Sequence, residues 1–163
     1  MFKNYSQDNI LFISDLHLGD PRHSSIYDMD MDTYAHKVID EINAQVTPED
    51  LLILVGDIVC DIKYVGLLEL INAGKILVIS GNRESKDMRI GLALAVGGYG
   101  ALSSIRLNNT LITHIPPHSS EAMKYEKVIH GHLHTDHIYN SRYYNVARSI
   151  RKGNVVSLST ILK

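Results

Sequence analysis

Histidine is unusually frequent in this chain: nine of the 163 residues are histidines, and five of them fall between His114 and His134. Several stand close to aspartate or asparagine in short polar clusters. Imidazole nitrogen together with carboxylate and amide oxygen is a donor set that suits Mn, Fe, Zn or Ni. It differs both from the thiolate sites of soft metals and from the oxygen cages that bind Ca or Mg. Seven such donors exceed the needs of one tetrahedral ion, and they match two divalent ions that share a bridging carboxylate. The seven are Asp15, His17, Asp57, Asn82, His114, His132 and His134.

These polar clusters come at the ends of short apolar runs, which is typical of buried strands that pass into loops. In the first half of the chain the runs are Ile10–Ser14, Leu51–Val55 and Lys75–Ile79. Between them, the spacing of apolar residues predicts helices over Thr33–Val46, with Asp32 as its N-cap, and over Lys63–Ala73. This alternation predicts an α/β fold with parallel strands. Open α/β sheets bind their ligands at the carboxyl ends of the strands.

The second half of the chain predicts further short elements and no repeat, linker or low-complexity tract. Residues 1–163 are therefore predicted to form a single domain. The segment Gly19–Asp30 is predicted to be irregular. The remaining predictions are a helix over Ser85–Val96, a hairpin of Leu102–Leu107 and Thr110–Ile115 around Asn108-Asn109, and strands over Lys127–His130, Tyr143–Val146 and Asn154–Leu158.

Charge and cysteine content narrow the class of protein. Sixteen basic and eighteen acidic residues give a net charge of −2, so strong bulk binding of nucleic acid is not expected. The single cysteine, Cys60, excludes an intramolecular disulfide and fits a reducing compartment. The first residues do not resemble a signal peptide, and no stretch approaches the roughly 20 apolar residues that cross a bilayer. The composition predicts a cytoplasmic protein without a membrane span, and it leaves the oligomeric state open.

The series D-x-H, G-D, G-N, H and G-H-x-H, which runs from Asp15 to His134, resembles the calcineurin-like metallophosphoesterase superfamily. The stretch THIPPHSSEAMKYEKVIHGHLH, followed by RYYNV, is similar to a compact phage and bacterial branch of that family. The resemblance implies an α/β fold of the αββα sandwich type, in which two mixed β-sheets are flanked by helices.

The resemblance also implies the role of each donor. Asp15, His17, Asp57 and His134 would hold a first metal ion. Asp57 would bridge to a second ion, which Asn82, His114 and His132 would complete. The implied activity is hydrolysis of a phosphodiester or nucleotide-type phosphoester by in-line attack of a metal-bridging hydroxide, with Mn as the expected metal and a small phosphoester or nucleotide as substrate. The implied catalytic residues are Asp57, Asn82, Arg83 and His114.

One departure from the family pattern bears on catalysis. The family has G-N-H-D or G-N-H-E, whereas this chain has Gly81-Asn82-Arg83-Glu84. Arginine cannot act as a general acid, although it can brace phosphate oxygens. Three hypotheses follow: a good leaving group, as in a diester of an acidic alcohol or a pyrophosphate-like bond; a proton supplied by His23 or His36; or a metal-binding scaffold without catalytic activity.

The resemblance is also compatible with a phosphomonoesterase or a protein phosphatase. The protein phosphatases of the superfamily have G-D-x-x-D-R-G, but Asp57 is followed by Ile58-Val59-Cys60-Asp61, so this activity is less favoured.

Several further residues have simpler interpretations. We expect Arg22 and His23 to contact substrate, Cys60 to be a core residue and His118 to support His114. We expect His130 to be structural, His137 to be solvated, and Asp28, Asp30 and Asp32 to provide negative charge at a helix N-terminus. Strand packing and surface charge are the expected roles of Tyr139, Tyr143, Tyr144, Arg142 and Arg148.

Overall fold

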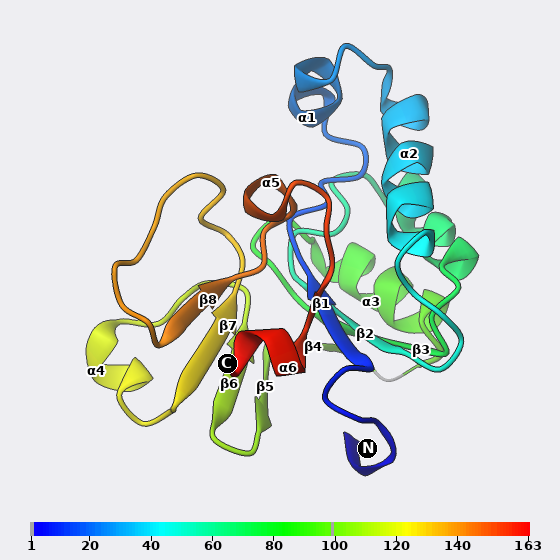
Figure 1. The fold of residues 1–163 in the computed structure, drawn as a ribbon. Helices are drawn as coiled ribbons and strands as arrows, with labels where there is room; N and C mark the ends of the chain where they lie inside the picture. Colours follow the sequence, from blue (N-terminus) through cyan, green and yellow to red (C-terminus); the bar gives the residue numbers. More distant parts are fainter. Residues whose placement is uncertain (1, 99) are drawn as a thin grey trace.

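The computed structural model describes residues 2–98 and 100–163, which form two mixed β-sheets flanked by helices (Figure 1). The larger sheet has the strand order β4-β3-β2-β1-β9. Four of its strands run parallel, and β9 pairs antiparallel with β1. Its strands are β1 (Ile10–Ile13), β2 (Leu51–Val55), β3 (Lys75–Ile79), β4 (Ala101–Leu102) and β9 (Val156–Ser157).

The smaller sheet has the strand order β5-β6-β7-β8. The first two strands form the predicted antiparallel hairpin, and Asn108 at its turn has a φ of 51°. Strands β6, β7 and β8 run parallel. The strands of this sheet are β5 (Ser104–Leu107), β6 (Thr110–Thr113), β7 (Lys127–His130) and β8 (Tyr143–Asn145).

Helices cover the outer faces of both sheets. In Figure 1, α2 lies to the right of the larger sheet, and α4 lies beside the smaller sheet on the left. Helix α3 packs into the same core cluster as the strands of the larger sheet. Across residues 2–98 and 100–163, none of the helices has the length and apolar character needed to span a membrane. The helices are η1 (Phe2–Asn4), α1 (Pro21–Ile26), α2 (Met31–Asn43), η2 (Ile62–Leu70), α3 (Lys86–Ala95), α4 (Ser119–Ala122), α5 (Arg148–Arg151) and α6 (Leu158–Ile161).

The strands of the larger sheet are buried on both faces, which explains their unbroken apolar sequences. Residues such as Leu11, Leu52 and Val78 pack against the buried faces of α2, η2 and α3. The intervening residues, such as Phe12 and Ile53, belong to a second cluster that also contains Ile112 and Ile129 of the smaller sheet. Each fully buried Leu, Ile or Phe contributes about 1.5–3 kcal/mol. The two sheets are thus held face to face, and this brings their strand ends together.

The predicted helices differ from the observed ones in three places. The segment predicted to be irregular contains α1, because Asp20 accepts a hydrogen bond from Arg22 N and Pro21 suits the first turn. Helix α2 is capped by Asp30, whose carboxylate accepts from Thr33 N at 2.8 Å, and not by Asp32. The predicted helix over Lys63–Ala73 is the 3₁₀ helix η2.

Three-residue spacing accounts for the 3₁₀ geometry of η2. Val65, Leu68 and Ile71 are buried and recur every third residue, which matches three residues per turn. Two strand predictions also change. Leu102 pairs with Ile79 in the larger sheet instead of extending β5, and Leu158 starts α6 instead of ending β9.

Candidate metal centre

The seven predicted donors all lie in loops at the carboxyl ends of strands. Asp15 and His17 follow β1, Asp57 follows β2, and Asn82 follows β3. The smaller sheet supplies the others: His114 follows β6, and His132 and His134 follow β7. The packing of the two sheets brings these loops together.

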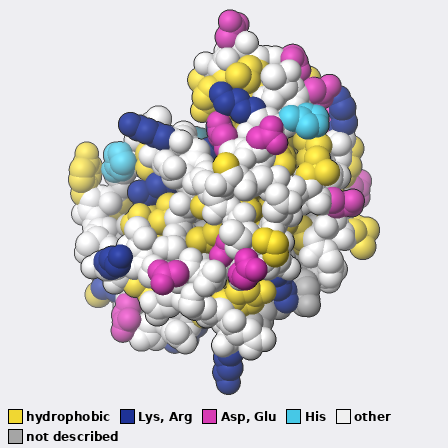
Figure 2. Space-filling model, turned by 45° about the vertical axis from the view of Figure 1, so that its right-hand side comes forward, with side chains coloured by type: hydrophobic (Ala, Val, Ile, Leu, Met, Phe, Trp, Pro, Cys, Tyr) yellow, Lys and Arg dark blue, Asp and Glu magenta, His cyan; other side chains and the backbone are white. Residues whose placement is uncertain are grey.

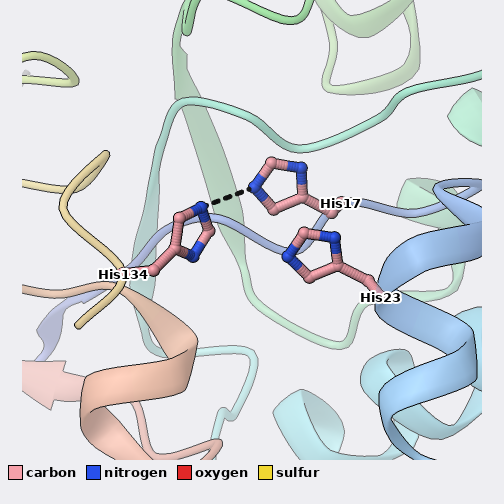
Figure 3. Close-up of side chains that lie close together, drawn as sticks. All are labelled: His17, His23 and His134. Carbon is pink, nitrogen blue, oxygen red and sulfur yellow. Dashed lines mark hydrogen bonds between the residues drawn. The ribbon is translucent and has the colours of Figure 1, made fainter.

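One group of donors surrounds His17. Its Nε2 lies 3.7 Å from Asp15 Oδ1, 3.9 Å from Asp57 Oδ2 and 3.2 Å from His134 Nε2. His134 Nε2 is in turn 3.6 Å from Asp15 Oδ1. Figure 3 shows the rings of His17 and His134 turned toward each other from different loops. Donor atoms of four residues therefore converge on one small volume.

A second group surrounds His114. Its Nε2 lies 3.4 Å from Asp57 Oδ2 and 3.1 Å from Asn82 Oδ1. His132 also offers a donor atom within 4.8 Å of donors on Asp57 and His114. Asp57 belongs to both groups through Oδ2, while its Oδ1 accepts a hydrogen bond from Arg83 N at 2.9 Å. One carboxylate oxygen thus faces both sets of donors.

The backbone at the site is held in an unusual conformation. Asp15, His17, Asp57 and His132 have φ values of 58°, 50°, 51° and 68°. Only a few per cent of non-glycine residues adopt such left-handed conformations, and they concentrate at functional sites. The loops after β1 and β2 stabilise each other, because Asp15 N donates to Gly56 O and His17 N donates to Asp57 O, both at 3.0 Å.

Two glycines leave room for the carboxylates. A Cβ atom on Gly81 would lie 2.2 Å from Asp57 Oδ1, and one on Gly131 would lie 2.4 Å from Asp15 Oδ2. Any side chain at either position would displace a donor. Glycine is therefore needed before Asn82 and before His132, because a carboxylate donor from another loop occupies the space that a side chain would fill.

Glu84 is a functional candidate that sequence reasoning did not assign to the site. Its buried carboxylate accepts hydrogen bonds from Ile58 N and, at 2.6 Å, from Gly81 N. It therefore links the loop after β2 to the loop after β3. Burial raises the pKa of Glu84 above its ordinary value. Its place in Gly81-Asn82-Arg83-Glu84 is the sequence signal that could have indicated this role.

The carboxylates and imidazoles of the site affect one another electrostatically. Burial alone would raise the pKa of Asp57, but its hydrogen bond and charge interaction with His114 outweigh burial and hold the pKa below its usual value. Burial alone would lower the pKa of His114, but the hydrogen bond and charge interaction with Asp57 outweigh burial and keep the pKa of His114 above its ordinary value. For Asp15, hydrogen bonds with His17 and Ser14 outweigh burial, and the pKa is lowered.

The donors open into a pocket with a volume of about 280 Å³. Arg22 and His23, predicted as substrate contacts, line it together with Arg83. The His23 ring stacks on His17 with ring centres 4.0 Å apart. Burial and, to a smaller extent, the charge interaction with His17 lower the pKa of His23 to about 4. Of the two candidate proton donors, His23 lies in this pocket, whereas His36 lines a separate depression beside α2.

Two predictions about neighbouring residues are wrong. Cys60 is half-buried, not a fully buried core residue, and its Sγ lies 3.5 Å from His17 Nδ1 because the loops after β1 and β2 run side by side. Burial raises the pKa of this thiol to about 12. His118 is exposed and caps α4, where its Nδ1 accepts from Ser120 N, so it does not support His114. His130, by contrast, is buried with Nδ1 at 2.8 Å from Gly131 O, as a structural histidine would be.

Arg148 is also placed differently from the prediction of surface charge. It is 5% exposed, and Nη2 donates to Glu41 Oε2 at 2.6 Å. Nη1 donates to the hydroxyls of Tyr27 and Tyr34 at 3.1 and 3.3 Å. These contacts connect α5 to α2 and to the end of α1, and they form a second charged cluster around a buried guanidinium, the Arg148 cluster (Tyr27, Tyr34, Glu41 and Arg148).

Comparison with known proteins gives a match in structure only. No protein-family model matches the chain, and a search of curated proteins finds no match. A solved structure with a similar α/β fold superimposes with a TM-score of 0.69 at 16% sequence identity, covering 93% of this chain and 96% of the other. It is described as the crystal structure of the protein of unknown function AQ665 from Aquifex aeolicus. The superposition shows a shared fold, and at this identity it shows the fold alone.

Proposed function

We propose that this protein is a dinuclear metal-dependent phosphoesterase of the calcineurin-like type that cleaves a phosphodiester or nucleotide-type phosphoester. The observation that supports it most directly is the position of Asp57, whose Oδ2 faces both donor groups. The ion-pair partners of Asp15 and Asp57 among the described residues are histidines. A pair of buried carboxylates ringed by imidazoles favours bound cations as counter-charge.

The residues fit two divalent ions in chemistry and in spacing. Donors bound to one ion at about 2.0–2.2 Å lie about 3–4 Å from each other, and the donor pairs here are separated by 3.1 to 3.9 Å. Asp15, His17, Asp57 and His134 would hold one ion, and Asp57, Asn82, His114 and His132 the other. Nitrogen and oxygen donors suit Mn, and they also suit Fe, Zn or Ni. Such ions supply charge neutralisation at the phosphoryl oxygens and lower the pKa of water.

The residues of the chain itself orient the site and its substrate. Ser14 Oγ and His132 N donate to Asp15, so this carboxylate is held in place before anything binds. The Arg22 and Arg83 side chains line the pocket and can donate to phosphoryl oxygens. Basic and acidic side chains are interspersed over the face shown in Figure 2, which fits a small substrate better than a polymer.

The test is hydrolysis of bis-p-nitrophenyl phosphate, a diester, against p-nitrophenyl phosphate, a monoester. Chelator-treated protein is assayed with Mn, Ni, Zn or Mg added singly, and with Asp57→Asn as the inactive control. Metal-dependent diester cleavage that is absent in the control supports the proposal. Because these leaving groups need no proton, failure to cleave either compound with any metal would overturn it and favour the non-catalytic scaffold.

A further inference from the structure

A second pocket, of about 410 Å³, adjoins the metal centre. Arg22 and Arg83 line both pockets, so their side chains stand at the boundary between the two. The second pocket contains no residue of either donor group. Its lining residues are Gly19, Asp20, Pro21, Arg22, Cys60 and Arg83.

The guanidinium of Arg22 is held in a fixed orientation. Its Nε and Nη2 donate to the two oxygens of Asp20 at 3.1 and 2.8 Å, and Asp20 itself is 4% exposed. This two-point contact fixes the plane of the arginine while 68% of its side chain stays exposed. The Nη1 group of Arg22 is therefore available for a ligand at little entropic cost.

Arg83 reaches the same boundary from the loop after β3. Its backbone N donates to Asp57 Oδ1, which places its Cα directly beside the shared carboxylate. Among the described residues its exposed guanidinium forms no ion pair. Two arginines and only one carboxylate, Asp20, thus border the second pocket, which leaves an excess of positive charge beside the metal centre.

We infer that the substrate contains a phosphoanhydride, with one phosphoryl group at the metal centre and the second held between Arg22 and Arg83. This inference rests on the proposed phosphoesterase function and specifies its substrate class. The oxygen of a water molecule forms a bond to the first phosphorus, and the bond from that phosphorus to the bridging oxygen breaks. The electron pair leaves with the second phosphate, and the water releases its protons to solvent. The products are two phosphate monoesters.

This leaving group accounts for arginine at position 83. An alkoxide leaves well only if it is protonated, and a general acid there contributes about 10²–10⁴-fold. A phosphate monoester has a second pKa of about 6 and departs as a stable anion at neutral pH. Its developing charge needs bidentate donors instead of a proton, and guanidinium groups provide them.

Binding tests the inference without turnover. The probe is methylenediphosphonate, whose P–C–P linkage cannot be hydrolysed, compared with inorganic phosphate by calorimetry on the Mn-loaded protein. We expect the diphosphonate to bind at least ten times more tightly. Arg22→Ala and Arg83→Ala should each weaken its binding about 10- to 100-fold, as expected for loss of charged hydrogen bonds, and should change phosphate binding much less. The control is Arg106→Ala, on β5, whose guanidinium bonds to Asn108 O in its own hairpin.

Activity separates this inference from the proposed function. Diadenosine diphosphate, which yields two molecules of AMP, should be cleaved faster than bis-p-nitrophenyl phosphate, and Arg83→Ala should reduce the first activity more than the second. Equal affinity for diphosphonate and phosphate, or equal losses of both activities in the arginine variants, would overturn the inference while diester hydrolysis upholds the phosphoesterase. Absence of all metal-dependent hydrolysis would instead overturn the phosphoesterase itself.

Discussion

The molecule contains two buried charged clusters that are built in opposite ways. In the Arg148 cluster, a guanidinium from α5 meets the carboxylate of Glu41 and the hydroxyls of Tyr27 and Tyr34. In the candidate metal centre, Asp15 and Asp57 meet imidazoles and the amide of Asn82. The first cluster carries its own permanent cation, whereas the second has only groups that become cationic by taking up protons.

This difference separates a structural cluster from a proposed metal site. Arginine stays charged at any working pH, so the Arg148 cluster holds its own counter-charge to Glu41 within the chain, although Arg148 Nε is buried without a hydrogen-bond partner among the described residues. At the candidate metal centre, a proton on His114 would compete with a metal ion for the same nitrogen, because ligands must be deprotonated to bind. The first cluster joins α5 to α1 and α2, and the second is expected to respond to metals and pH. The comparison can be tested by changing one cluster and measuring the other.

The largest effect is expected from Asp57→Asn. Loss of the shared carboxylate should reduce metal-dependent hydrolysis by about 10³-fold or more, as typically follows removal of a group that stabilises the reaction electrostatically. Metal content, measured by plasma emission spectroscopy after gel filtration, should fall below two ions per chain. Glu41→Gln in the Arg148 cluster is the matched control and should keep both ions. Two tightly bound ions in Asp57→Asn would mean that Asp57 is not shared.

Arg148→Met tests the other cluster. It leaves Glu41 and two tyrosine hydroxyls without their cation, and breaking a buried pair costs about 3–5 kcal/mol. Because the side chain of Glu41 is 31% exposed, we expect a decrease of about 2–3 kcal/mol in the free energy of unfolding, measured in urea. Metal content should not change. A variant that loses its metals would show that the two clusters are coupled.

Metal removal provides a third measurement. A ligand at 100 times its Kd stabilises the folded state by about 2.7 kcal/mol. We therefore expect EDTA to lower the unfolding free energy of the wild-type protein by about that amount, and to have much less effect on Asp57→Asn. Arg148→Met should remain sensitive to EDTA. An identical response of all three proteins would show that the stabilising metal binds elsewhere.

The smallest effect concerns His23 in the metal-free protein. Its folded pKa of about 4 lies below that of an unfolded histidine, about 6.5. Between these values the unfolded state binds more protons, so His23 makes stability fall as the pH decreases from 6.5 to 4. After allowance for its partial exposure, we expect a loss of about 1–2 kcal/mol. His23→Gln should remove this part of the pH dependence in urea titrations with EDTA, whereas His36→Gln on α2 should not.

The sequence was sufficient for the arrangement of strands and loops at the site. Doubly buried strands have continuous apolar sequences, and the polar residues that end them, such as Asp15, Asp57 and Asn82, stand out by contrast. The predicted strand Lys127–His130 matches β7, but the predicted strand Thr110–Ile115 contains His114, whereas β6 ends at Thr113. The structure brings the seven predicted donors into two groups that share Asp57, and metal binding there stays a prediction.

Contacts between distant segments could not be predicted in this way. The burial of Arg148 depends on Glu41, which lies 107 residues away, and nothing in its local sequence distinguishes it from a surface arginine. Cys60 lies beside His17 because two loops are aligned by backbone hydrogen bonds. The prediction for α1 is wrong for a different reason. The Asp20-Pro21 start signal is present in the sequence, but the surrounding polar residues indicate a loop.

The left-handed backbone at Asp15, His17, Asp57 and His132 also limits how the site can change in evolution. Asparagine, aspartate, histidine and glycine tolerate this conformation, whereas β-branched residues do not. If the proposed metals bind here, a descendant that lost them would therefore be expected to keep small or polar residues at these four positions. Loss of the proposed activity would then leave few apolar substitutions at these positions, and an inactive homologue would still look much like an active one.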